Sequence, residues 1–132
     1  MTHVVVAIIQ KKETPTSYLL VCSKKDFGEF TGYFYPPAGH IEEGEDDETA
    51  LRREVQEELG VNIVSAKKII DTEGDIANQK TSWYLCDVDS YDFTVDKEEL
   101  RDAEFFTEED MKKMNIWPAT KSVFERYVLY NN

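Results

Sequence analysis

The chain has 132 residues, with 15 Lys and Arg against 27 Asp and Glu, which gives a formal net charge of −12. A chain of this length can bury a core, so we expect a single domain over residues 1–132. The charge argues against a broad grip on a nucleic-acid duplex, because such binding depends on phosphate neutralisation by Lys and Arg. No apolar run approaches the roughly 20 residues that cross a bilayer, and the N-terminus does not resemble a signal peptide. We therefore expect a cytoplasmic protein with no membrane partner.

The first third of the chain predicts a β-hairpin. Residues 4–9 (VVVAII) form a β-branched run suited to a strand covered on both faces, and residues 18–23 are predicted as the returning strand. Pro36 and Pro37 disfavour helix in the residues that precede them, so the chain should stay extended there. The pieces between the strands and the next helix are a polar loop at 24–32, an extended piece at 33–35 and a loop-like stretch at 39–44.

A helix is predicted after this loop, because both of its ends carry terminus signals. Asp46 or Asp47 can cap its first turn, and acidic residues there complement the helix dipole. The helix should run to about Leu59, with Gly60 as its C-terminal stop. An apolar stripe at i, i+4 and i+8 starts at Leu51 and should face the core.

The same helix brings three carboxylates together. Glu54, Glu57 and Glu58 fall at i, i+3 and i+4, which places them on one face. Like charges at this spacing cost roughly 0.2–0.5 kcal/mol per pair on an isolated helix. A hard divalent cation would offset that repulsion, since Mg²⁺ and Mn²⁺ take oxygen ligands. A solvated acidic face is the alternative that the spacing alone leaves open.

The second half of the chain predicts further strands and a closing helix. Its apolar runs alternate with polar stretches, and Pro118 suits the first turn of a helix. We expect strands at 63–71 and 81–88, a loop at 72–80, a short strand at Phe105 and Phe106, a helical turn at 108–114, and a helix from Pro118 to about Tyr130 with Val123, Tyr127 and Tyr130 facing the core.

Two cysteines, Cys22 and Cys86, lie far apart in apolar, strand-like runs. They lack the paired spacing of a zinc site. We expect two core thiols rather than a disulfide or a metal site.

Residues 39–61 carry a motif that contains the three glutamates. The pattern G-x5-E-x7-R-E-U-x-E-E-x-G-U, with U aliphatic, is the Nudix box, and the chain therefore resembles a MutT-like Nudix hydrolase. The resemblance implies an α/β fold, an α/β/α sandwich with a central mixed β-sheet between the box helix and the C-terminal helix. The specified positions are all filled, by Gly39, Glu45, Arg53, Glu54, Val55, Glu57, Glu58, Gly60 and Val61.

The resemblance also implies a metal site and a reaction. Glu54, Glu57 and Glu58 would supply carboxylate ligands to Mg²⁺ or Mn²⁺, and the backbone carbonyl of Gly39 would reach the same cation. Hydrolysis of a pyrophosphate needs water at a phosphorus atom surrounded by negative oxygens, and a bound cation neutralises charge and lowers the pKa of water. Glu99 precedes a segment that resembles the family's last strand, so it is a further candidate ligand.

Arg53 and the general base have alternatives. Arg53 can pair with Glu57 or Glu45 and hold the carboxylates in orientation, or it can contact a phosphate directly. Glu54 is the first candidate base, because the first glutamate of R-E-U-x-E-E serves so in some members. Others use a loop glutamate, which here would be Glu98 or Glu99.

Substrate contacts are expected just before the box. Phe34 stands where many relatives carry a tryptophan, and Tyr33 and Tyr35 flank it. These aromatic residues could form a base pocket, although an aromatic on a short strand is often a core residue. His40 could touch a phosphate oxygen or bond locally. The chain reads PPAG at 36–39 where many members read F-P-G-G, which leaves Gly39 intact but weakens any subfamily assignment.

The function implied by the resemblance is metal-dependent hydrolysis of a nucleoside diphosphate linked to another moiety. Candidate substrates are nucleoside triphosphates, dinucleoside polyphosphates, nucleotide sugars and ADP-ribose. There are two alternatives: a sensor that binds a nucleotide without cleaving it, and an enzyme with different chemistry on the same fold. The expected partner is a small nucleotide, and a homodimer is a further expectation from the resemblance.

Overall fold

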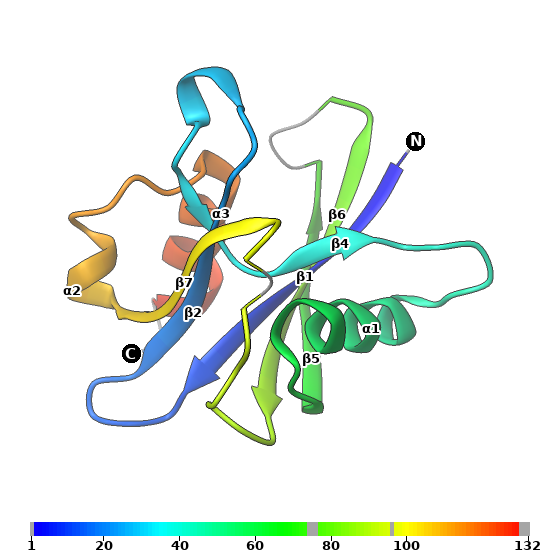
Figure 1. The fold of residues 1–132 in the computed structure, drawn as a ribbon, viewed down its shortest axis with the longest axis horizontal. Helices are drawn as coiled ribbons and strands as arrows, with labels where there is room; N and C mark the ends of the chain where they lie inside the picture. The colour runs from blue at the N-terminus through cyan, green and yellow to red at the C-terminus, as the bar shows by residue number, and fades with distance from the viewer. Residues whose placement is uncertain (1, 74–76, 96, 130–132) are drawn as a thin grey trace.

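The computed structural model describes residues 2–73, 77–95 and 97–129. Its centre is a mixed seven-stranded sheet (Figure 1), in which the strand order β3-β2-β1-β6-β5 is extended by β4 on β1 and β7 on β2. β1 runs parallel to β6, and the other pairs are antiparallel. The strands are β1 (Thr2–Lys11), β2 (Ser17–Ser23), β3 (Phe34–Tyr35), β4 (Ala38–His40), β5 (Ile63–Thr72), β6 (Gln79–Val88) and β7 (Leu100–Thr107).

Two strands pair with β1 along the edge that faces away from β6. Val4, Val5 and Val6 pair with β4, whereas Gln10 and Lys11 pair with β2. The strand β4 corrects the prediction of a loop at 39–44, since residues 38–40 are extended and satisfy their backbone groups on β1. This pairing holds Gly39 against the sheet, and a loop at 41–46 connects β4 to the helix that carries the glutamates.

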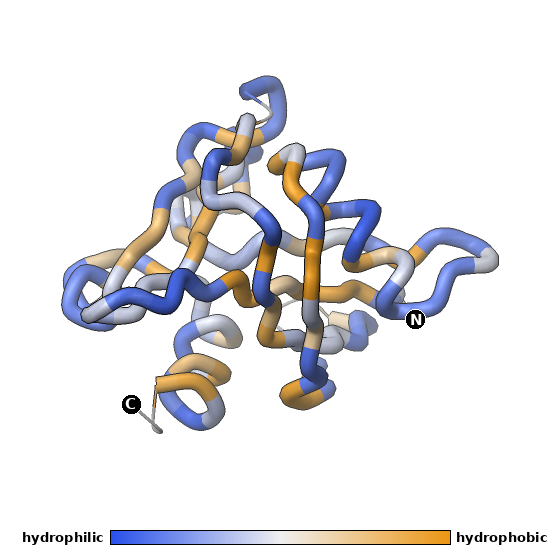
Figure 2. Tube along the Cα trace, turned by 90° about the horizontal axis from the view of Figure 1, so that it is seen from below, coloured by the Kyte–Doolittle hydropathy of each residue, from blue (hydrophilic) through white to orange (hydrophobic). Residues whose placement is uncertain are grey.

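The two faces of β1 bury two separate clusters, as expected for a strand covered on both sides. Val5, Ala7 and Ile9 pack under α1 (Asp47–Leu59), whose Leu51 and other apolar residues are buried. The alternate residues of β1 pack under α3 (Pro118–Val123) and η2 (Phe124–Val128). Figure 2 shows hydrophobic stretches along the strands and hydrophilic loops around them. The predicted α/β/α sandwich with a mixed sheet is confirmed.

Both ends of α1 agree with the sequence prediction. The backbone N–H of Thr49 donates to the Asp46 carboxylate at 2.8 Å, so Asp46 is the N-cap. Gly60 takes the left-handed conformation, with φ of 71°, which favours glycine. These caps fix where the helix starts and ends, and thereby the height at which its glutamates meet β4.

The C-terminal helix departs from the prediction in its last turns. η2 is a π-helical turn, whose hydrogen bonds join residues five apart, so its core-facing positions shift from those of an α-helix. Val123 and Val128 are therefore buried, whereas Tyr127 is 40% exposed, contrary to its predicted core position. Tyr130, the third predicted core residue, lies outside the described residues.

Three further differences concern short elements. The 24–32 loop contains a helical turn, η1 (Gly28–Phe30), and the strand predicted at Phe105 and Phe106 is the longer β7. The helical turn α2 (Glu108–Met111) ends before the predicted residue 114.

Cys22 and Cys86 are buried free thiols, as predicted, and burial raises the pKa of Cys86 to about 12. None of the described helices has the length and hydropathy required to cross a membrane.

Candidate active site

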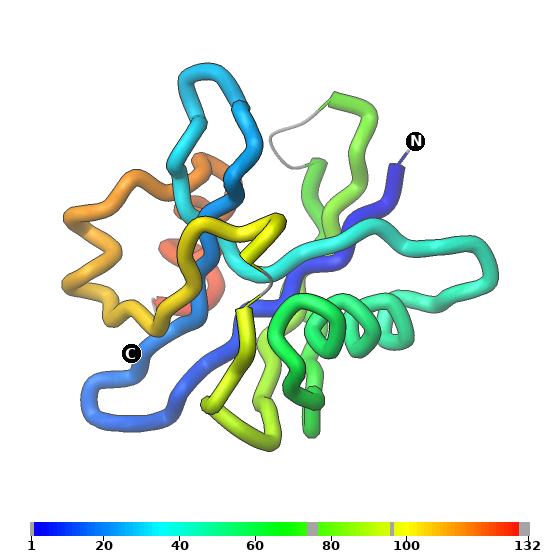
Figure 3. Tube along the Cα trace, in the orientation of Figure 1, coloured from blue at the N-terminus to red at the C-terminus, as the bar shows by residue number. Residues whose placement is uncertain are grey.

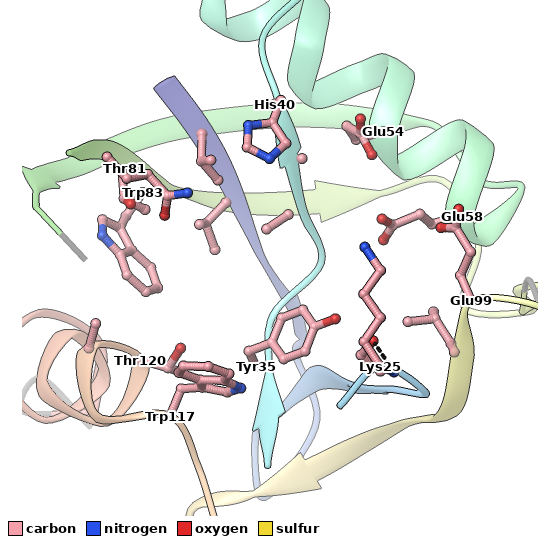
Figure 4. Close-up of a pocket in the computed structure, with 18 of the residues that line it drawn as sticks. Lys25, Tyr35, His40, Glu54, Glu58, Thr81, Trp83, Glu99, Trp117 and Thr120 are labelled. Atoms are coloured by element: carbon pink, nitrogen blue, oxygen red, sulfur yellow. Dashed lines mark hydrogen bonds between the residues drawn. The ribbon is translucent and has the colours of Figure 1, made fainter. Parts of the chain in front are cut away.

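A cleft of about 520 Å³ opens on the face of the sheet opposite to the one that α1 covers, and it reaches round to the exposed edge of that helix. Figure 4 shows its two ends, with the carboxylates of α1 at one and two tryptophans at the other. The strands β1 and β6 form its floor through Val4, Val6, Thr81 and Trp83. The ends of β2 and β4, the segment before β7 and the start of α3 form its walls.

Glu54, Glu58 and Glu99 gather at the acidic end of the cleft (Figure 4). Glu58 is among the groups that act on the Glu54 carboxyl, and two neighbouring carboxylates repel each other unless a proton or a cation offsets their charge. Burial raises the pKa of Glu54 above its ordinary value, and neighbouring Arg53 opposes that shift. The pair therefore offers oxygen donors at a position that favours the loss of one negative charge or the arrival of a positive one.

Gly39 lies against the side chain of Glu54. A Cβ atom on Gly39 would overlap the Cγ, Cδ and Oε1 atoms of Glu54, so only glycine permits this approach. Carboxylate and carbonyl oxygens are the donors that Mg²⁺ and Mn²⁺ prefer. The chemistry of Gly39, Glu54 and Glu58 thus fits the predicted cation.

Glu57 lies apart from this group. Its side chain is 59% exposed, it contacts Arg53 at 3.3 Å, and it is not among the described residues that line the cleft. Over the described parts of the chain, no three His, Cys, Asp or Glu side chains already form a cluster fit to hold a metal. Of the predicted ligands, Gly39, Glu54, Glu58 and Glu99 line the cleft, and Glu57 does not. Glu98, an alternative candidate for the general base, is also outside the described lining.

Arg53 is held by the box itself. Its Nε and Nη2 donate to the two carboxylate oxygens of Glu45 at 2.7 and 2.9 Å. Its Nη1 donates to Glu54 at 2.9 Å and to Glu57 at 3.3 Å, and its Nη2 also donates to the carbonyl of His40 at 3.0 Å. Both predicted partners, Glu45 and Glu57, are therefore present. With every nitrogen engaged, Arg53 orients Glu54 and ties α1 to β4.

Arg53→Lys is expected to lower kcat about 10- to 100-fold, the usual effect of losing a residue that orients metal ligands. A lysine keeps the charge but cannot span Glu45 and Glu54 with a planar fork. Steady-state kinetics measures the effect. Arg52→Lys is the matched control on the same helix, because Arg52 contacts Glu48 and the carbonyl of Ile63 outside the cleft. Equal losses in both variants would contradict the assigned role of Arg53.

The aromatic lining differs from the prediction. Phe34 packs into the core beside Phe106, with ring centroids 5.3 Å apart, and Tyr33 contacts Phe30. Neither is among the described residues of the cleft, whereas Tyr35 is. Successive residues of a strand point to opposite faces, so placing Phe34 in the core turns Tyr35 toward the cleft. The aromatic residues in the described lining of the cleft are therefore Phe27, Tyr35, Trp83 and Trp117, and the predicted base contacts of Phe34 and Tyr33 stay a prediction.

Trp83 and Trp117 are two residues of the cleft that the sequence analysis did not predict. Trp83 is 3% exposed, and its Nε1 donates to Thr72 Oγ1 at 2.8 Å. Trp117 stacks on Phe30 with centroids 4.8 Å apart and planes 29° apart, which covers one face of the indole. The sequence offered one signal for Trp117, namely its position directly before the helix that starts at Pro118. The contact of Trp117 with the 24–32 loop could not be predicted from the sequence.

Tyr35, His40 and Lys25 are three further polar residues in the lining of the cleft. Burial raises the pKa of Tyr35 to about 12, and its hydroxyl hydrogen-bonds Ser23, so Tyr35 stays protonated at neutral pH. His40 lines the cleft beside Gly39, as expected for a candidate substrate contact. Lys25, which was not predicted, extends from the end of β2 toward the acidic end (Figure 4).

Comparison with known proteins gives the chain a family. The NUDIX domain family matches residues 1–127. The NAD-capped RNA hydrolase NudC of Haemophilus influenzae is 30% identical over 89 residues, which is 67% of this chain and 34% of that protein. The chain thus spans about a third of the length of this curated relative.

Two solved structures share the fold. The MutT NUDIX hydrolase from Burkholderia pseudomallei superposes with a TM-score of 0.80 at 22% identity, covering 95% of this chain and 96% of that one. The NUDIX domain of Shewanella oneidensis NrtR, complexed with ADP ribose, gives a TM-score of 0.79 at 17% identity, covering 93% and 83%. With a filled box on a capped helix and a family match over nearly its whole length, this chain belongs to the Nudix family.

Proposed function

We propose that the protein is a metal-dependent pyrophosphohydrolase that cleaves a nucleoside diphosphate linked to another moiety. The observation that carries this proposal is the position of Glu54 and Glu58 at one end of an open cleft, with Glu54 against Gly39. Two acidic groups that lie close together form a position where a cation is favoured, because it offsets their mutual repulsion. The cleft beside them has room for a nucleotide, since small-molecule sites usually measure about 300–1,000 Å³.

The carbonyl of Gly39 and the carboxylates of Glu54, Glu57, Glu58 and Glu99 would hold Mg²⁺ or Mn²⁺. Such an ion, when bound, neutralises phosphate charge and lowers the pKa of bound water. Glu57 would have to turn from Arg53 to join the others, because its carboxylate now contacts that guanidinium. We propose Glu54 as the general base, since burial raises its pKa and Arg53 fixes its orientation. Glu99 is the second candidate for this role.

We assign the nucleobase to the aromatic end of the cleft. Tyr35, Trp83 and Trp117 line that end, and one indole face of Trp117 is already covered by Phe30. Stacking of a base on an aromatic side chain is worth roughly 1–3 kcal/mol. A base held there would direct its phosphates toward Glu54 and Glu58, past His40, because the acidic and aromatic ends belong to one cleft (Figure 4).

The comparisons favour adenosine-containing substrates. The relative NudC is named for NAD-capped RNA, and the NrtR domain was solved with ADP ribose. Both NAD and ADP ribose contain an adenosine diphosphate joined to a second group. The net charge of −12 favours the free nucleotide over an RNA carrying it, because phosphate contacts dominate RNA affinity. We propose that the protein acts on such small molecules in the cytoplasm.

A substrate panel tests the proposal. NAD, ADP ribose, a dinucleoside tetraphosphate, a nucleotide sugar and the nucleoside triphosphates are incubated with the protein and either Mg²⁺ or Mn²⁺, and the products are separated by chromatography. We expect release of a nucleoside monophosphate from at least one member, and no release with EDTA. Binding without cleavage of every member under both metals would favour the nucleotide sensor instead.

A further inference from the structure

Lys25 carries a positive charge in a cleft whose other charged side chains are mainly glutamates. Among the described residues that line it, Lys25 is the one lysine or arginine, against four glutamates. Arg53 adjoins the cleft, but its nitrogens are taken by Glu45, Glu54 and Glu57 and by the carbonyl of His40. The positive charge that the walls present to a ligand therefore comes from Lys25.

The backbone at Lys25 is fixed where β2 ends. Its N–H donates to the Ser23 hydroxyl at 3.0 Å, and Ser23 also hydrogen-bonds Tyr35. The N–H of the preceding Lys24 donates to the carbonyl of Glu99 at 3.0 Å, so the end of β2 and the segment before β7 lie side by side (Figure 3). These hydrogen bonds hold the backbone of Lys25 between the aromatic and acidic ends of the cleft.

The side chain of Lys25 extends from that position along the cleft (Figure 4). Figure 4 shows Lys25 extended past the hydroxyl end of Tyr35, with its ammonium directed toward Glu58. A nucleotide whose base lies at Trp117 and whose terminal phosphate lies at Glu58 would pass this ammonium with its phosphates. An ammonium binds phosphate oxygens as a compact point charge and needs no fixed angle, so a flexible side chain suffices.

We propose that Lys25 binds a phosphate oxygen of the substrate, between the base and the metal-binding carboxylates, and so selects ligands that carry a phosphate chain. This inference rests on the proposed function, because it uses the same cleft. In this proposal, Lys25 neutralises part of the negative charge of the phosphates, and the metal neutralises the rest. The proposal also predicts that Lys25 affects the affinity for a nucleotide but not the affinity for a nucleoside. A ligand without phosphates should bind at the aromatic end without contacting Lys25.

Intrinsic fluorescence can measure these affinities. The chain has two tryptophans, and both line the cleft. The intact protein is titrated with ADP and with adenosine in EDTA, so that no metal contributes. Wild type should bind ADP at least about tenfold more tightly than adenosine, given the usual strength of a hydrogen bond to a charged group. Lys25→Ala should remove most of that difference and leave adenosine binding unchanged, and Lys25→Arg should restore it.

Lys67→Ala is the matched control, because it removes the same charge from an exposed position on β5 outside the cleft. Equal ADP affinity in wild type and Lys25→Ala would overturn the role of Lys25 and leave the proposed function standing. A parallel loss of ADP and adenosine binding in Lys25→Ala would also overturn it, by showing a structural effect. If wild type responds to neither ligand and cleaves nothing in the panel, the proposed function itself fails.

Discussion

Glu58→Gln is expected to lower kcat about 10³-fold, because charge stabilisation by a bound cation is worth several kcal/mol and each 1.36 kcal/mol is tenfold in rate. The amide keeps the size of the side chain but removes the negative charge at the acidic end of the cleft. It also leaves Glu54 as the remaining carboxylate of α1 in the described lining of the cleft. Steady-state kinetics on whichever panel member is cleaved measures the loss.

Two variants on the same helix sharpen this result. Glu48→Gln removes an equal charge from a side chain that is 61% exposed and paired with Arg52, and it should leave kcat unchanged. Glu57→Gln should have a smaller effect than Glu58→Gln, because Glu57 lies outside the described cleft lining and contacts Arg53. If Glu58→Gln turns over like wild type, the assignment of the acidic end as the catalytic centre is wrong.

Gly39→Ala is expected to lower kcat by about 10²-fold or more, since displacing a catalytic group by about 1 Å can cost that much. The added methyl group would overlap the side chain of Glu54, so either Glu54 or β4 must move. Overpacking of this kind costs about 1–3 kcal/mol of stability. Thermal unfolding measured beside kcat separates the two effects.

Gly44→Ala serves as the comparison for a general glycine effect. Gly44 has a φ of 83°, which disfavours alanine, but an added Cβ would meet nothing within 4 Å. This variant should lose a little stability through backbone strain and keep its turnover. Normal turnover in Gly39→Ala, with Glu54 unmoved, would contradict the close approach on which the site is built.

The sequence predicted those parts of the fold that local signals determine. Asp46 and Gly60 mark the ends of α1 through capping and a left-handed turn, and both signals lie within the helix sequence itself. The glutamate spacing and the pairing of Arg53 with Glu45 follow from the box. The buried state of Cys22 and Cys86 follows from the apolar strands that hold them.

The parts that sequence could not give depend on distant partners. Residues 38–40 become a strand because β1 offers them an edge, a contact between segments more than 30 residues apart. Tyr127 leaves the core because a π-helical turn changes the residues that share a face. Trp117 reaches the cleft through stacking on Phe30, which lies 87 positions earlier in the chain.

The substrate contacts show the same limit at the level of single residues. Phe34 and Tyr35 are adjacent, and a two-residue strand carries too short a pattern to tell which one faces the core. The structure resolves this through the contact of Phe34 with Phe106 on β7. Lys25 carries no motif at all, and its importance follows from the charge of the cleft around it.

Binding of Mn²⁺ to the free protein tests the central claim most directly, because it isolates the acidic end of the cleft from substrate and turnover. Electron paramagnetic resonance reports the free ion as protein is added. Wild type should deplete that signal, and Glu54→Gln and Glu58→Gln should each weaken binding, whereas Glu48→Gln should bind like wild type. Undiminished Mn²⁺ binding in both Glu54→Gln and Glu58→Gln would contradict a cation site built on Glu54, Glu58 and Gly39.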